Sequence, residues 1–384
     1  MRIAFVVERP TQFEAPFYKH VAETESAHRL AVIFTGGAPA ESSFDPELGR
    51  QVGWGFDLTS GYPWKAAPAS GSASWLEEEL GSERPDLVII NGYTQRPYLQ
   101  ALRAAHSLRL PVALRIDSTL FASGARRRWL KAMIFAGFLL PAFDLFFAVG
   151  GQSRRYLLAH GVARERIALF PYAVDVAGFA SASRQGAAER ERLRLDLDLP
   201  EDEPVVLALA KLSAREAPWD LLRAAALLGR RAPWLAIAGD GPERERLAAF
   251  AQEQGLTRLR WLGYVPYPEL PRLYGACDLF VHAAGEERWG VSVEEAMACG
   301  LPVVASSQVG AGYDLIRRGG NGWTYPHGDP AALGTALERA LRLKRSAVAA
   351  VNRDLLERWD YSASWRGILR AAERLTSQRS PTRA

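Results

Sequence analysis

The chain has 384 residues, a length that predicts two or three domains or one large one, and its composition of 48% apolar and 23% charged residues excludes global disorder. Its net charge of +4 suits an anionic ligand, but no Lys/Arg-rich tail or other nucleic-acid-binding motif accompanies it. Two cysteines are too few for a disulfide framework or a four-thiolate zinc site, so we expect a reducing, cytoplasmic environment and no bound metal.

Short apolar runs typical of buried strands recur along the whole chain. The first, residues 3–7, is too short for a signal peptide and is followed at once by Glu8 and Arg9. Helix-like stretches separate the runs, which predicts parallel sheets with right-handed crossovers and helices on both faces. The remaining runs cover residues 30–34, 87–90, 112–116, 145–149, 205–210, 235–238, 279–281 and 303–305.

One uncharged, mostly apolar stretch, residues 132–143, is shorter than the roughly 20 residues of a membrane-spanning helix. Pro141 splits it into a helix and a following strand. A basic cluster beside an aromatic residue precedes it, formed by Arg126, Arg127, Arg128 and Trp129. Two interpretations stay open, a peripheral contact with the inner membrane face and a solvated helix start.

The alternation of strands and helices stops at residues 177–190, which are rich in small side chains. We therefore predict an N-terminal domain over residues 1–176, a linker over 177–190 and a C-terminal domain over 191–360. From residue 361 an amphipathic helix crosses back to the N-terminal domain, and a tail extends to residue 384. A cleft between two such α/β domains is where ligands usually bind.

Residues 278–305 are the most informative stretch and predict a strand, a loop, a helix and a second strand. The loop carries Glu286 and Glu287, and the helix carries Glu294 and Glu295, so a loop acid and a helix acid point at one crevice. Free amides at a helix start favour phosphate oxygens, and carboxylates accept hydrogen bonds from sugar hydroxyls. The stretch therefore predicts a site for a diphosphate flanked by polyols.

These residues resemble the Glu-x7-Glu signature of retaining nucleotide-sugar glycosyltransferases of family four, which have the GT-B fold. Glu286 with Glu294 and Glu287 with Glu295 both satisfy the spacing, and the contexts Glu-Arg-Trp-Gly and Glu-Ala-Met-Ala-Cys-Gly-Leu-Pro-Val-Val select the second pair. Further stretches occur in the family's order, namely Val205-Val-Leu-Ala-Leu-Ala-Lys-Leu, Ala236-Ile-Ala-Gly-Asp-Gly-Pro-Glu, Trp261-Leu-Gly-Tyr-Val and Gly319-Gly-Asn-Gly-Trp.

The resemblance implies an α/β chain of two facing Rossmann-like domains, each a doubly wound parallel sheet, with a cleft between them. It also implies transfer of a sugar, with retention, from a nucleoside-diphosphate-sugar donor to a hydroxyl acceptor, which is a glycan, a lipid-linked molecule or a small molecule. The nucleotide sugar is then a substrate, and no cofactor is needed. A catalytically silent relative that binds a nucleotide sugar or a protein partner is the alternative, and an epimerase or phosphorylase on the same fold is a third.

The resemblance also assigns individual residues. It implies that Glu287 binds hydroxyls of the donor sugar, that Glu295 binds the ribose, and that Lys211 provides a cation for the donor phosphates. It further implies that Trp289, Gly290 and Val291 present their backbone to the sugar and the diphosphate. Gly239, Asp240 and Gly241 would form a strand-to-helix turn that lines the cleft, and Val265 would lie beside the base.

Two positions depart from the family pattern. Where the family usually has a second lysine, this chain has Glu216, so the neighbouring Arg215 would have to supply the missing positive charge. Where many members have an acceptor-side histidine at the end of the fourth N-terminal strand, this chain has Arg115 and Asp117 nearby. We therefore take Asp117, with Glu287, Lys211 and Arg215, as the candidate catalytic residues.

Overall fold

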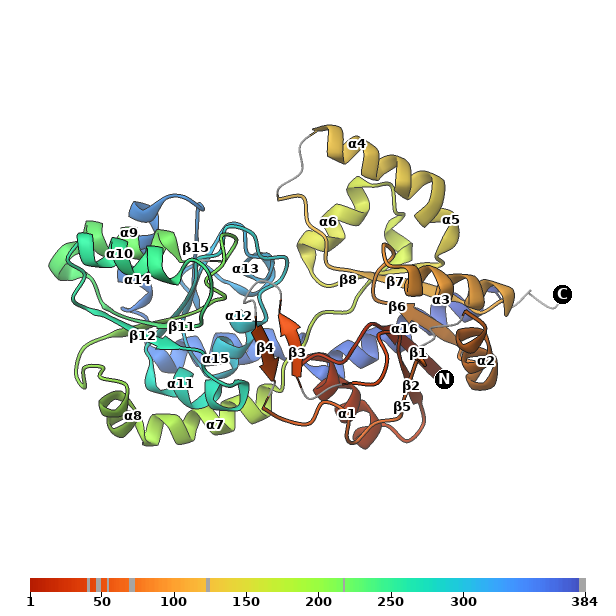
Figure 1. Ribbon diagram of the computed structural model, residues 1–384, viewed down its shortest axis with the longest axis horizontal. Helices are drawn as coiled ribbons and strands as arrows, with labels where there is room; N and C mark the ends of the chain where they lie inside the picture. Colours follow the sequence, from red (N-terminus) through yellow and green to blue (C-terminus); the bar gives the residue numbers. More distant parts are fainter. Residues whose placement is uncertain are drawn as a thin grey trace. The chain divides into compact units, whose positions relative to one another are not determined.

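The computed structural model describes residues 1–39, 42–45, 50–53, 55–68, 73–121, 125–216 and 218–379 (Figure 1). The chain forms two α/β units, neither of which is one continuous stretch of sequence. Unit 1 consists of residues 1–41, 57–173 and 359–384, and unit 2 consists of residues 42–56 and 174–358. Among the described helices, none combines the length and the hydropathy that crossing a membrane requires.

Unit 1 is built on a seven-stranded sheet in which every neighbouring pair of strands is parallel. The spatial order is β5 (Trp64–Ala66), β2 (Arg29–Phe34), β1 (Arg2–Val7), β6 (Leu87–Ile90), β7 (Val112–Ile116), β8 (Leu145–Ala148) and β9 (Ile167–Leu169). Central strands are apolar on both faces because helices cover both: Val6 belongs to one buried cluster, whereas Phe5 contacts Phe17 and Tyr18 on the other side.

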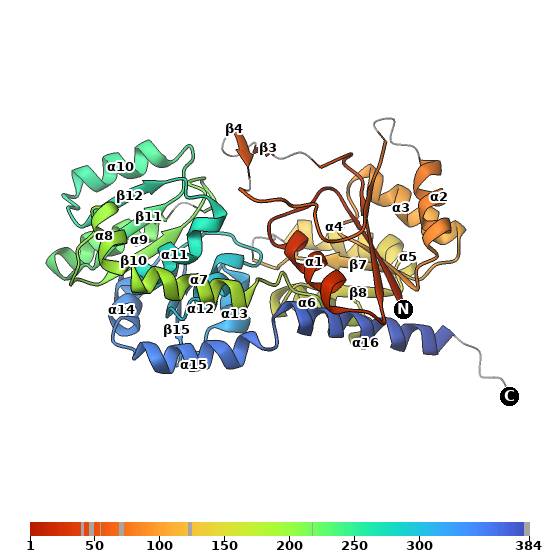
Figure 2. The ribbon, with the colours of Figure 1, turned by 90° about the horizontal axis from the view of Figure 1, so that it is seen from below.

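Helices pack on each face of this sheet. One layer contains α2 (Ala73–Glu83), α3 (Arg96–Ser107), α4 (Ala125–Ile134), the π-helix η1 (Phe135–Leu139), α5 (Leu140–Ala142) and α6 (Gly151–Ala159). The other contains α1 (Glu14–Thr24) and α16 (Tyr361–Arg379). Helix α16 packs on α1 and on β9 (Figure 2), with the rings of Phe17 and Tyr361 6.1 Å apart. The last helix of the chain therefore completes the first unit.

Unit 2 contains a six-stranded parallel sheet. Its order is β12 (Leu259–Gly263), β11 (Trp234–Ala238), β10 (Val205–Leu209), β13 (Leu279–His282), β14 (Val303–Ser306) and β15 (Gly322–Tyr325). The chain progresses outward from β10 to β12 and then returns to place β13 on the other side of β10. The order thus reverses between β10 and β13, and ligands of such sheets bind beyond the carboxyl ends of the strands at the reversal.

Two helical layers also enclose the sheet of unit 2. Helices α9 (Trp219–Leu228), α10 (Arg244–Glu253) and α14 (Pro330–Ala340) cover one face (Figure 1). Helices α7 (Val176–Ala188), α8 (Arg190–Asp196), α11 (Leu270–Ala276), α12 (Val291–Ala298) and α15 (Arg345–Leu356) cover the other, and α13 (Gly310–Leu315) follows β14. Unit 2 also contains the short 3-10 turns η3 (Gly229–Arg231) and η4 (Tyr267–Glu269), and unit 1 contains a third, η2 (Arg164–Arg166). These two parallel-sheet units confirm the predicted α/β fold class.

The stretch that we predicted as a linker, residues 177–190, instead forms most of α7 and the start of α8. Its small side chains allow close packing of α7 on α11: a Cβ on Gly186 would lie 2.5 Å from the carbonyl oxygen of Arg272, and one on Gly275 would lie 2.4 Å from that of Ser183. The small residues that made this stretch resemble a linker are thus needed for α7 and α11 to pack closely. The passage into unit 2 comes earlier, between Ala173 and Val174.

An antiparallel hairpin of β3 (Ser42–Asp45) and β4 (Arg50–Gly53) belongs to unit 2, although its sequence lies within the first 60 residues. The Tyr264 hydroxyl donates a hydrogen bond to the carbonyl oxygen of Gly53 at 3.0 Å. The ring of Phe56 stacks on Tyr267 with centroids 5.6 Å apart. The hairpin therefore packs against the segment that follows β12.

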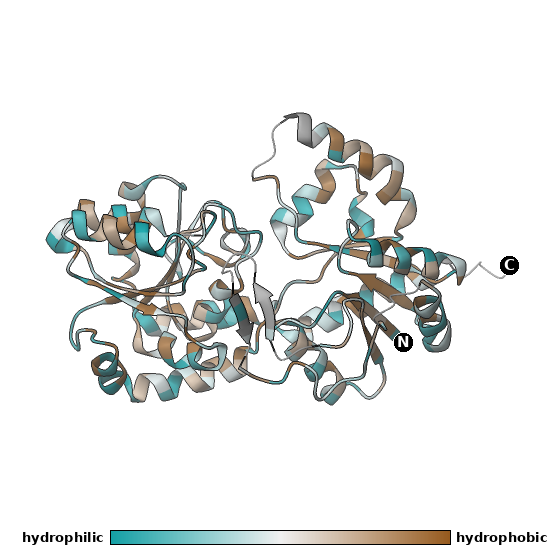
Figure 3. Ribbon diagram, in the orientation of Figure 1, coloured by the Kyte–Doolittle hydropathy of each residue, from teal (hydrophilic) through white to brown (hydrophobic). Residues whose placement is uncertain are grey.

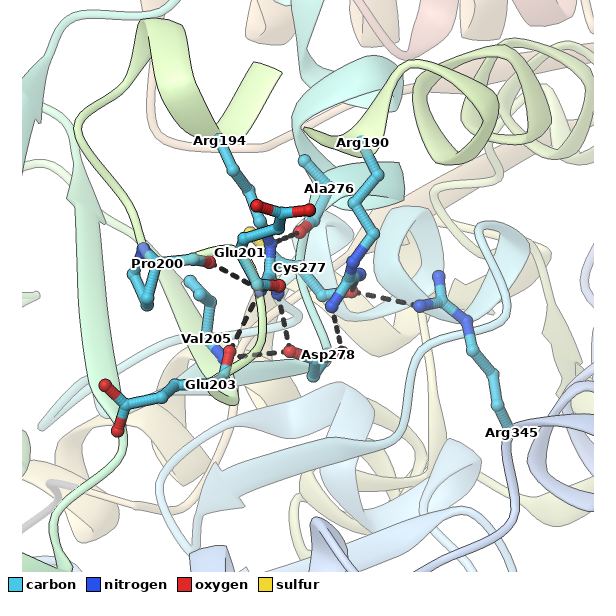
Figure 4. Close-up of polar contacts among 10 residues, drawn as sticks. All are labelled: Arg190, Arg194, Pro200, Glu201, Glu203, Val205, Ala276, Cys277, Asp278 and Arg345. Atoms are coloured by element: carbon cyan, nitrogen blue, oxygen red, sulfur yellow. Dashed lines mark hydrogen bonds and ion pairs between the residues drawn. The ribbon is translucent and has the colours of Figure 1, made fainter. Parts of the chain in front are cut away.

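A polar cluster closes the amino ends of β10 and β13 (Figure 4). Arg194 is 1% exposed, and its guanidinium forms an ion pair with Asp278 at 2.7 Å. It also donates to the carbonyl oxygens of Ala276, Pro200, Glu201 and Glu203. Arg190 pairs with the second carboxylate oxygen of Asp278, and Arg345 donates to the carbonyl oxygen of Cys277. Every nitrogen of the Arg194 guanidinium thus has an acceptor.

Candidate functional site

The carboxyl edge of the unit 2 sheet carries the predicted donor-binding residues. Lys211 follows β10, the turn 239–241 follows β11, and Val265 follows β12. Backbone hydrogen bonds join these segments, from Leu212 N–H to Asp240 at 2.9 Å and from Gly239 N–H to Gly263 at 2.7 Å. The structure therefore brings together segments that are far apart in sequence.

Glycine is required at the turn after β11. Gly239 has a φ of 132°, and a Cβ there would lie 1.9 Å from the carbonyl oxygen of Ala210. Gly241 has a φ of 153°, and its Cβ would lie 2.7 Å from the carbonyl oxygen of Leu212. Asp240 accepts a hydrogen bond from the Gly241 N–H at 2.9 Å and so closes the same turn. These contacts fix the backbone of the turn against the loop after β10.

Helix α12 begins at the reversal of strand order, after the loop that follows β13. Its N-cap, Gly290, has a φ of 95°, and no side chain caps this end of the helix. A Cβ on Gly290 would lie 2.9 Å from Val309 and 3.0 Å from His282. Glycine thus lets the loop pass close to both residues. The Val293 N–H donates to the Gly290 carbonyl at 3.0 Å, whereas the amides of Val291 and Ser292, at the start of α12, have no intrahelical acceptor.

The loop before α12 is fixed along its backbone to the segment after β14. Glu287 donates its N–H to the Gln308 carbonyl at 2.9 Å and accepts from the Gly310 N–H at 3.0 Å. The Trp289 carbonyl accepts from the Ala311 N–H at 2.7 Å, and the Trp289 N–H donates to the Glu287 carboxylate at 3.3 Å. Both backbone groups of Trp289, which we expected to face a ligand, therefore have protein partners.

The Glu287 side chain is 21% exposed and lies beside two basic side chains. Its Oε2 is 3.9 Å from an Arg215 nitrogen and 4.0 Å from Nε2 of His282. Burial lowers the pKa of His282 to about 4, with Glu216 opposing the shift, so the imidazole is neutral at pH 7. Arg215 is therefore the charged neighbour of Glu287.

The Arg215 side chain lies between two carboxylates, those of Glu216 and Glu287. Its guanidinium forms an ion pair with Glu216, and it also donates to the Glu286 carbonyl at 3.0 Å. The Glu216 side chain is only 12% exposed. The acid that replaces the family's second lysine is thus paired with the cation that was expected to compensate for it, and the pair together carries no net charge.

Glu295 is buried and held by two tyrosines that the sequence did not indicate. The Tyr274 hydroxyl donates to its carboxylate at 3.0 Å, and Tyr267 donates as well. Burial raises the pKa of Glu295 to about 7, although both hydrogen bonds lower it. Because Tyr267 stacks on Phe56, a residue that follows the β3–β4 hairpin supports the side chain that positions Glu295. Only the folded structure reveals this connection.

Glu294, next in the chain, has a different environment. It is 0% exposed, it accepts from the indole N–H of Trp289 at 3.3 Å, and its Oε1 has no hydrogen-bond partner. Burial raises the pKa of this carboxyl well above its ordinary value, with the hydrogen bond from Trp289 opposing the shift. Its contact holds Trp289 in the interior, which leaves Glu287 and Glu295 as the acids suited to a ligand.

The acceptor-side candidates lie in unit 1, at the end of β7. Arg115 is 4% exposed, pairs with Glu14 at 2.7 Å, and donates to the carbonyl oxygens of Phe170 and Pro171. Its guanidinium also lies 3.7 Å from the centre of the Phe170 ring. Arg115 is therefore a structural residue. Asp117 is half-buried just beyond the end of the strand and stays a candidate for the acceptor side. Within the described residues, no group of three His, Cys, Asp or Glu side chains is placed to hold a metal ion.

Two family models match the chain, "Glycosyl transferase 4-like domain" over residues 20–173 and "Glycosyl transferases group 1" over residues 189–360. A Thermomonospora curvata protein named D-inositol 3-phosphate glycosyltransferase is 26% identical over 89% of this chain and 76% of its own length. A Streptomyces fradiae 2-deoxystreptamine N-acetyl-D-glucosaminyltransferase is 37% identical over 32% of this chain, and the match spans only 30% of that relative.

The fold recurs in solved structures. The Anabaena protein HepE in complex with UDP superposes with a TM-score of 0.71 at 19% identity, covering 98% of this chain and all of that one. The two family models together account for most of the chain, and the superposition on the solved neighbour includes both parallel-sheet units. The chain belongs to the family-four glycosyltransferases of the GT-B fold.

Proposed function

We propose that this protein transfers a sugar from a nucleoside-diphosphate-sugar donor to a hydroxyl acceptor, with retention of the anomeric configuration and without a bound metal. The main support for this proposal is the arrangement of one helix start and two acids at the reversal of strand order in unit 2. There the uncapped start of α12 lies between Glu287, which is partly exposed, and Glu295, whose carboxylate two tyrosines orient.

Each part of the donor has a partner at this edge. The α12 amides and the positive end of the helix dipole favour the diphosphate, and Lys211 adds a cation from the neighbouring strand end. Glu295 accepts hydrogen bonds from ribose hydroxyls, and Glu287 accepts them from the sugar. The glycine turn 239–241 and Val265 line the same edge near the base.

The chemistry that suits these groups is direct front-face transfer. As the anomeric carbon–oxygen bond breaks, the departing phosphate oxygen takes the proton of the acceptor hydroxyl, and the acceptor oxygen bonds to the anomeric carbon on the same face. No protein nucleophile is needed, so the protein contributes positioning and charge stabilisation. Asp117 is our candidate for orienting the acceptor hydroxyl.

The relatives indicate which substrates to try first. One solved neighbour is named as a UDP complex, and a Mycolicibacterium smegmatis relative is named as a GDP-mannose-dependent phosphatidylinositol monomannoside mannosyltransferase. The other named relatives act on inositol phosphate and 2-deoxystreptamine. We therefore place UDP and GDP sugars first as donors, and polyols and glycolipids first as acceptors, for a cytoplasmic enzyme.

A thermal-shift screen of UDP, GDP, ADP and TDP tests donor binding. A nucleotide at 100 times its dissociation constant should stabilise the protein by about 2.7 kcal/mol. A labelled donor then tests transfer on an acceptor panel, and NMR of the product gives the anomeric configuration.

The variant Glu287→Ala should lose transfer by at least about 100-fold, because its contact with the sugar strengthens as charge develops, while nucleotide binding changes little. Glu286→Ala is the matched control, because the neighbouring position contacts Arg215 only through its backbone carbonyl. Nucleotide binding without turnover on any acceptor, unchanged by Glu287→Ala, would instead identify a silent binding protein.

A further inference from the structure

Helix α4 and the π-helix η1 expose a continuous apolar stripe. Among the described residues with large exposed hydrophobic side chains, five of twelve occur within these two adjacent helices. Their exposed fractions are 65% for Trp129, 55% for Leu130, 55% for Met133, 41% for Ile134 and 41% for Phe138. We call these five residues the α4 stripe. Figure 3 shows the brown, hydrophobic colouring along α4 that corresponds to it.

The stripe is not an unfilled part of the unit 1 core, because the same helices bury a separate face. Phe135 and Leu139 are both 0% exposed, and the Phe135 ring packs against Tyr156 and His160 of the α6 segment. Spacings of one, three and four residues place the stripe along one side of the helix. The helix is therefore anchored to unit 1 on one face and presents a second apolar face to solvent.

The segment of sequence that carries the stripe has charges of one sign. Between Asp117 and Asp144 the sequence contains four basic residues and no acidic one. Three of the basic residues, Arg126, Arg127 and Arg128, lie in the first turn of α4, and their side chains lie outside the described part of the structure. The fourth, Lys131, lies 5.2 Å from the centre of the Tyr156 ring. Apolar and basic residues thus share one short helical segment.

We propose that the α4 stripe docks onto the surface of an anionic lipid bilayer. An interfacial helix inserts bulky apolar side chains at the level of the headgroups, where tryptophan is favoured, and its basic residues attract anionic lipids. A second copy of this chain fits less well, because it would bring two segments of four positive charges together. This inference concerns binding to a surface and does not depend on the proposed transfer reaction.

Co-sedimentation with vesicles tests it. The full chain should bind vesicles of equal parts phosphatidylcholine and phosphatidylglycerol, bind pure phosphatidylcholine vesicles more weakly, and lose affinity as salt is raised. The variant Trp129→Ser/Met133→Ser/Ile134→Ser should bind anionic vesicles about 100-fold more weakly. Replacing the three arginines by glutamine should weaken binding by about fivefold per charge.

The matched control is Leu195→Ser/Leu227→Ser, which removes two leucines of unit 2 that are 79% and 65% exposed. This control should bind vesicles like the wild type, and all variants should keep their melting temperature and their nucleotide-induced shift. Equal vesicle binding by the stripe variant and the wild type would overturn the proposal. So would an absence of vesicle binding, or a dimer in sedimentation velocity that the stripe substitutions dissociate.

Discussion

The two ends of the unit 2 sheet differ in how their charged groups are satisfied. At the amino end, Arg194 is buried with an acceptor for each nitrogen of its guanidinium. At the carboxyl end, Glu295 is buried with a pKa near 7, and Glu294 keeps one carboxyl oxygen without a partner. The amino edge of the sheet therefore has a closed polar network, whereas the helix that starts at the carboxyl edge carries Glu294, which has one unpartnered oxygen, and Glu295, whose pKa burial raises to about 7.

This difference separates stability from binding. A buried charge whose hydrogen bonds are complete contributes to folding only as long as every partner is present. A buried acid with remaining acceptor capacity is costly in the free protein and becomes useful when a ligand supplies donors. Substitutions at the amino edge should therefore change stability, and those at the carboxyl edge should change ligand affinity.

The largest expected effect is at the amino edge. Arg194→Met should destabilise the protein by about 3 to 5 kcal/mol, because four carbonyl oxygens lose their donor inside the unit and Asp278 loses one of its two arginine partners. Urea denaturation measures the loss. Arg192→Met, whose side chain is 81% exposed, is the control and should cost less than about 0.5 kcal/mol. Similar values for the two variants would remove the structural role assigned to this network.

Gly290→Ala should cost about 2 to 3 kcal/mol of stability and should also weaken nucleotide binding. The added Cβ combines left-handed backbone strain with contacts to Val309 and His282 that are too short. Gly255→Ala separates the two causes, because Gly255 has a φ of 63° with no atom near the added Cβ. Gly255→Ala should cost only about 1 kcal/mol. Thermal unfolding of both variants measures the two losses of stability.

Glu295→Gln should weaken nucleotide binding by about 10- to 100-fold, because charged acceptors form the stronger hydrogen bonds. Titration calorimetry across pH measures this loss. Wild-type affinity should fall as pH drops below 7, where Glu295 takes up a proton, whereas the variant should show no such dependence. Affinities with the same pH profile in both proteins would place the nucleotide elsewhere.

Glu295→Gln should have the opposite effect on stability. Folding raises the pKa of Glu295 from the ordinary 4.5 to about 7, so its favourable contribution is complete below the lower value and is lost as pH rises through the higher one. The variant should therefore gain stability relative to the wild type on going from acidic pH to pH above 7. Melting temperatures at matched pH values measure the gain.

The smallest effect is expected at the paired charges beside the loop. Glu216→Gln should tighten nucleotide binding by about two- to fivefold, because Arg215 would lose its ion-pair partner and gain attraction for the diphosphate. Arg215→Gln should weaken binding by a similar factor. If Glu216→Gln instead weakens binding, as judged by calorimetry, the acid itself contacts the ligand.

The sequence predicted the elements whose chemistry is local. Central strands such as 87–90 and 112–116 are buried on both faces, so their apolar runs are unambiguous. The edge strand Ile167–Leu169 has only three residues, one of them exposed, and the strand Gly322–Tyr325 is short and partly polar, so their patterns did not distinguish them from loops. The hairpin of β3 and β4 is stabilised by residues about 200 positions away, which periodicity cannot reveal.

The candidate site shows the same limit. Glu287, Gly290 and Glu295 lie close together in sequence, so one loop and one helix could be inferred from their spacing. The support of Glu295 by Tyr267 and Tyr274 depends on how α11 packs beside α12, and the pairing of Arg115 with Glu14 depends on α1 lying over the sheet. Glu294 and Glu295 are neighbours with equal side chains, and only the tertiary structure shows that burial raises the pKa of both while different donors, Trp289 for one and two tyrosines for the other, oppose the shift.

The position of α16 has a consequence for how the chain matures. During synthesis the strands of unit 1 emerge early, but Trp365 and Ile368, which are almost completely buried in the finished protein, are translated after all of unit 2. Until then, the α1 side of the first sheet lacks its cover and Phe17 lacks the ring of Tyr361. Unit 1 can therefore complete its fold only after residues 361–379 have been synthesised, whereas residues 174–358 of unit 2 are available for folding earlier.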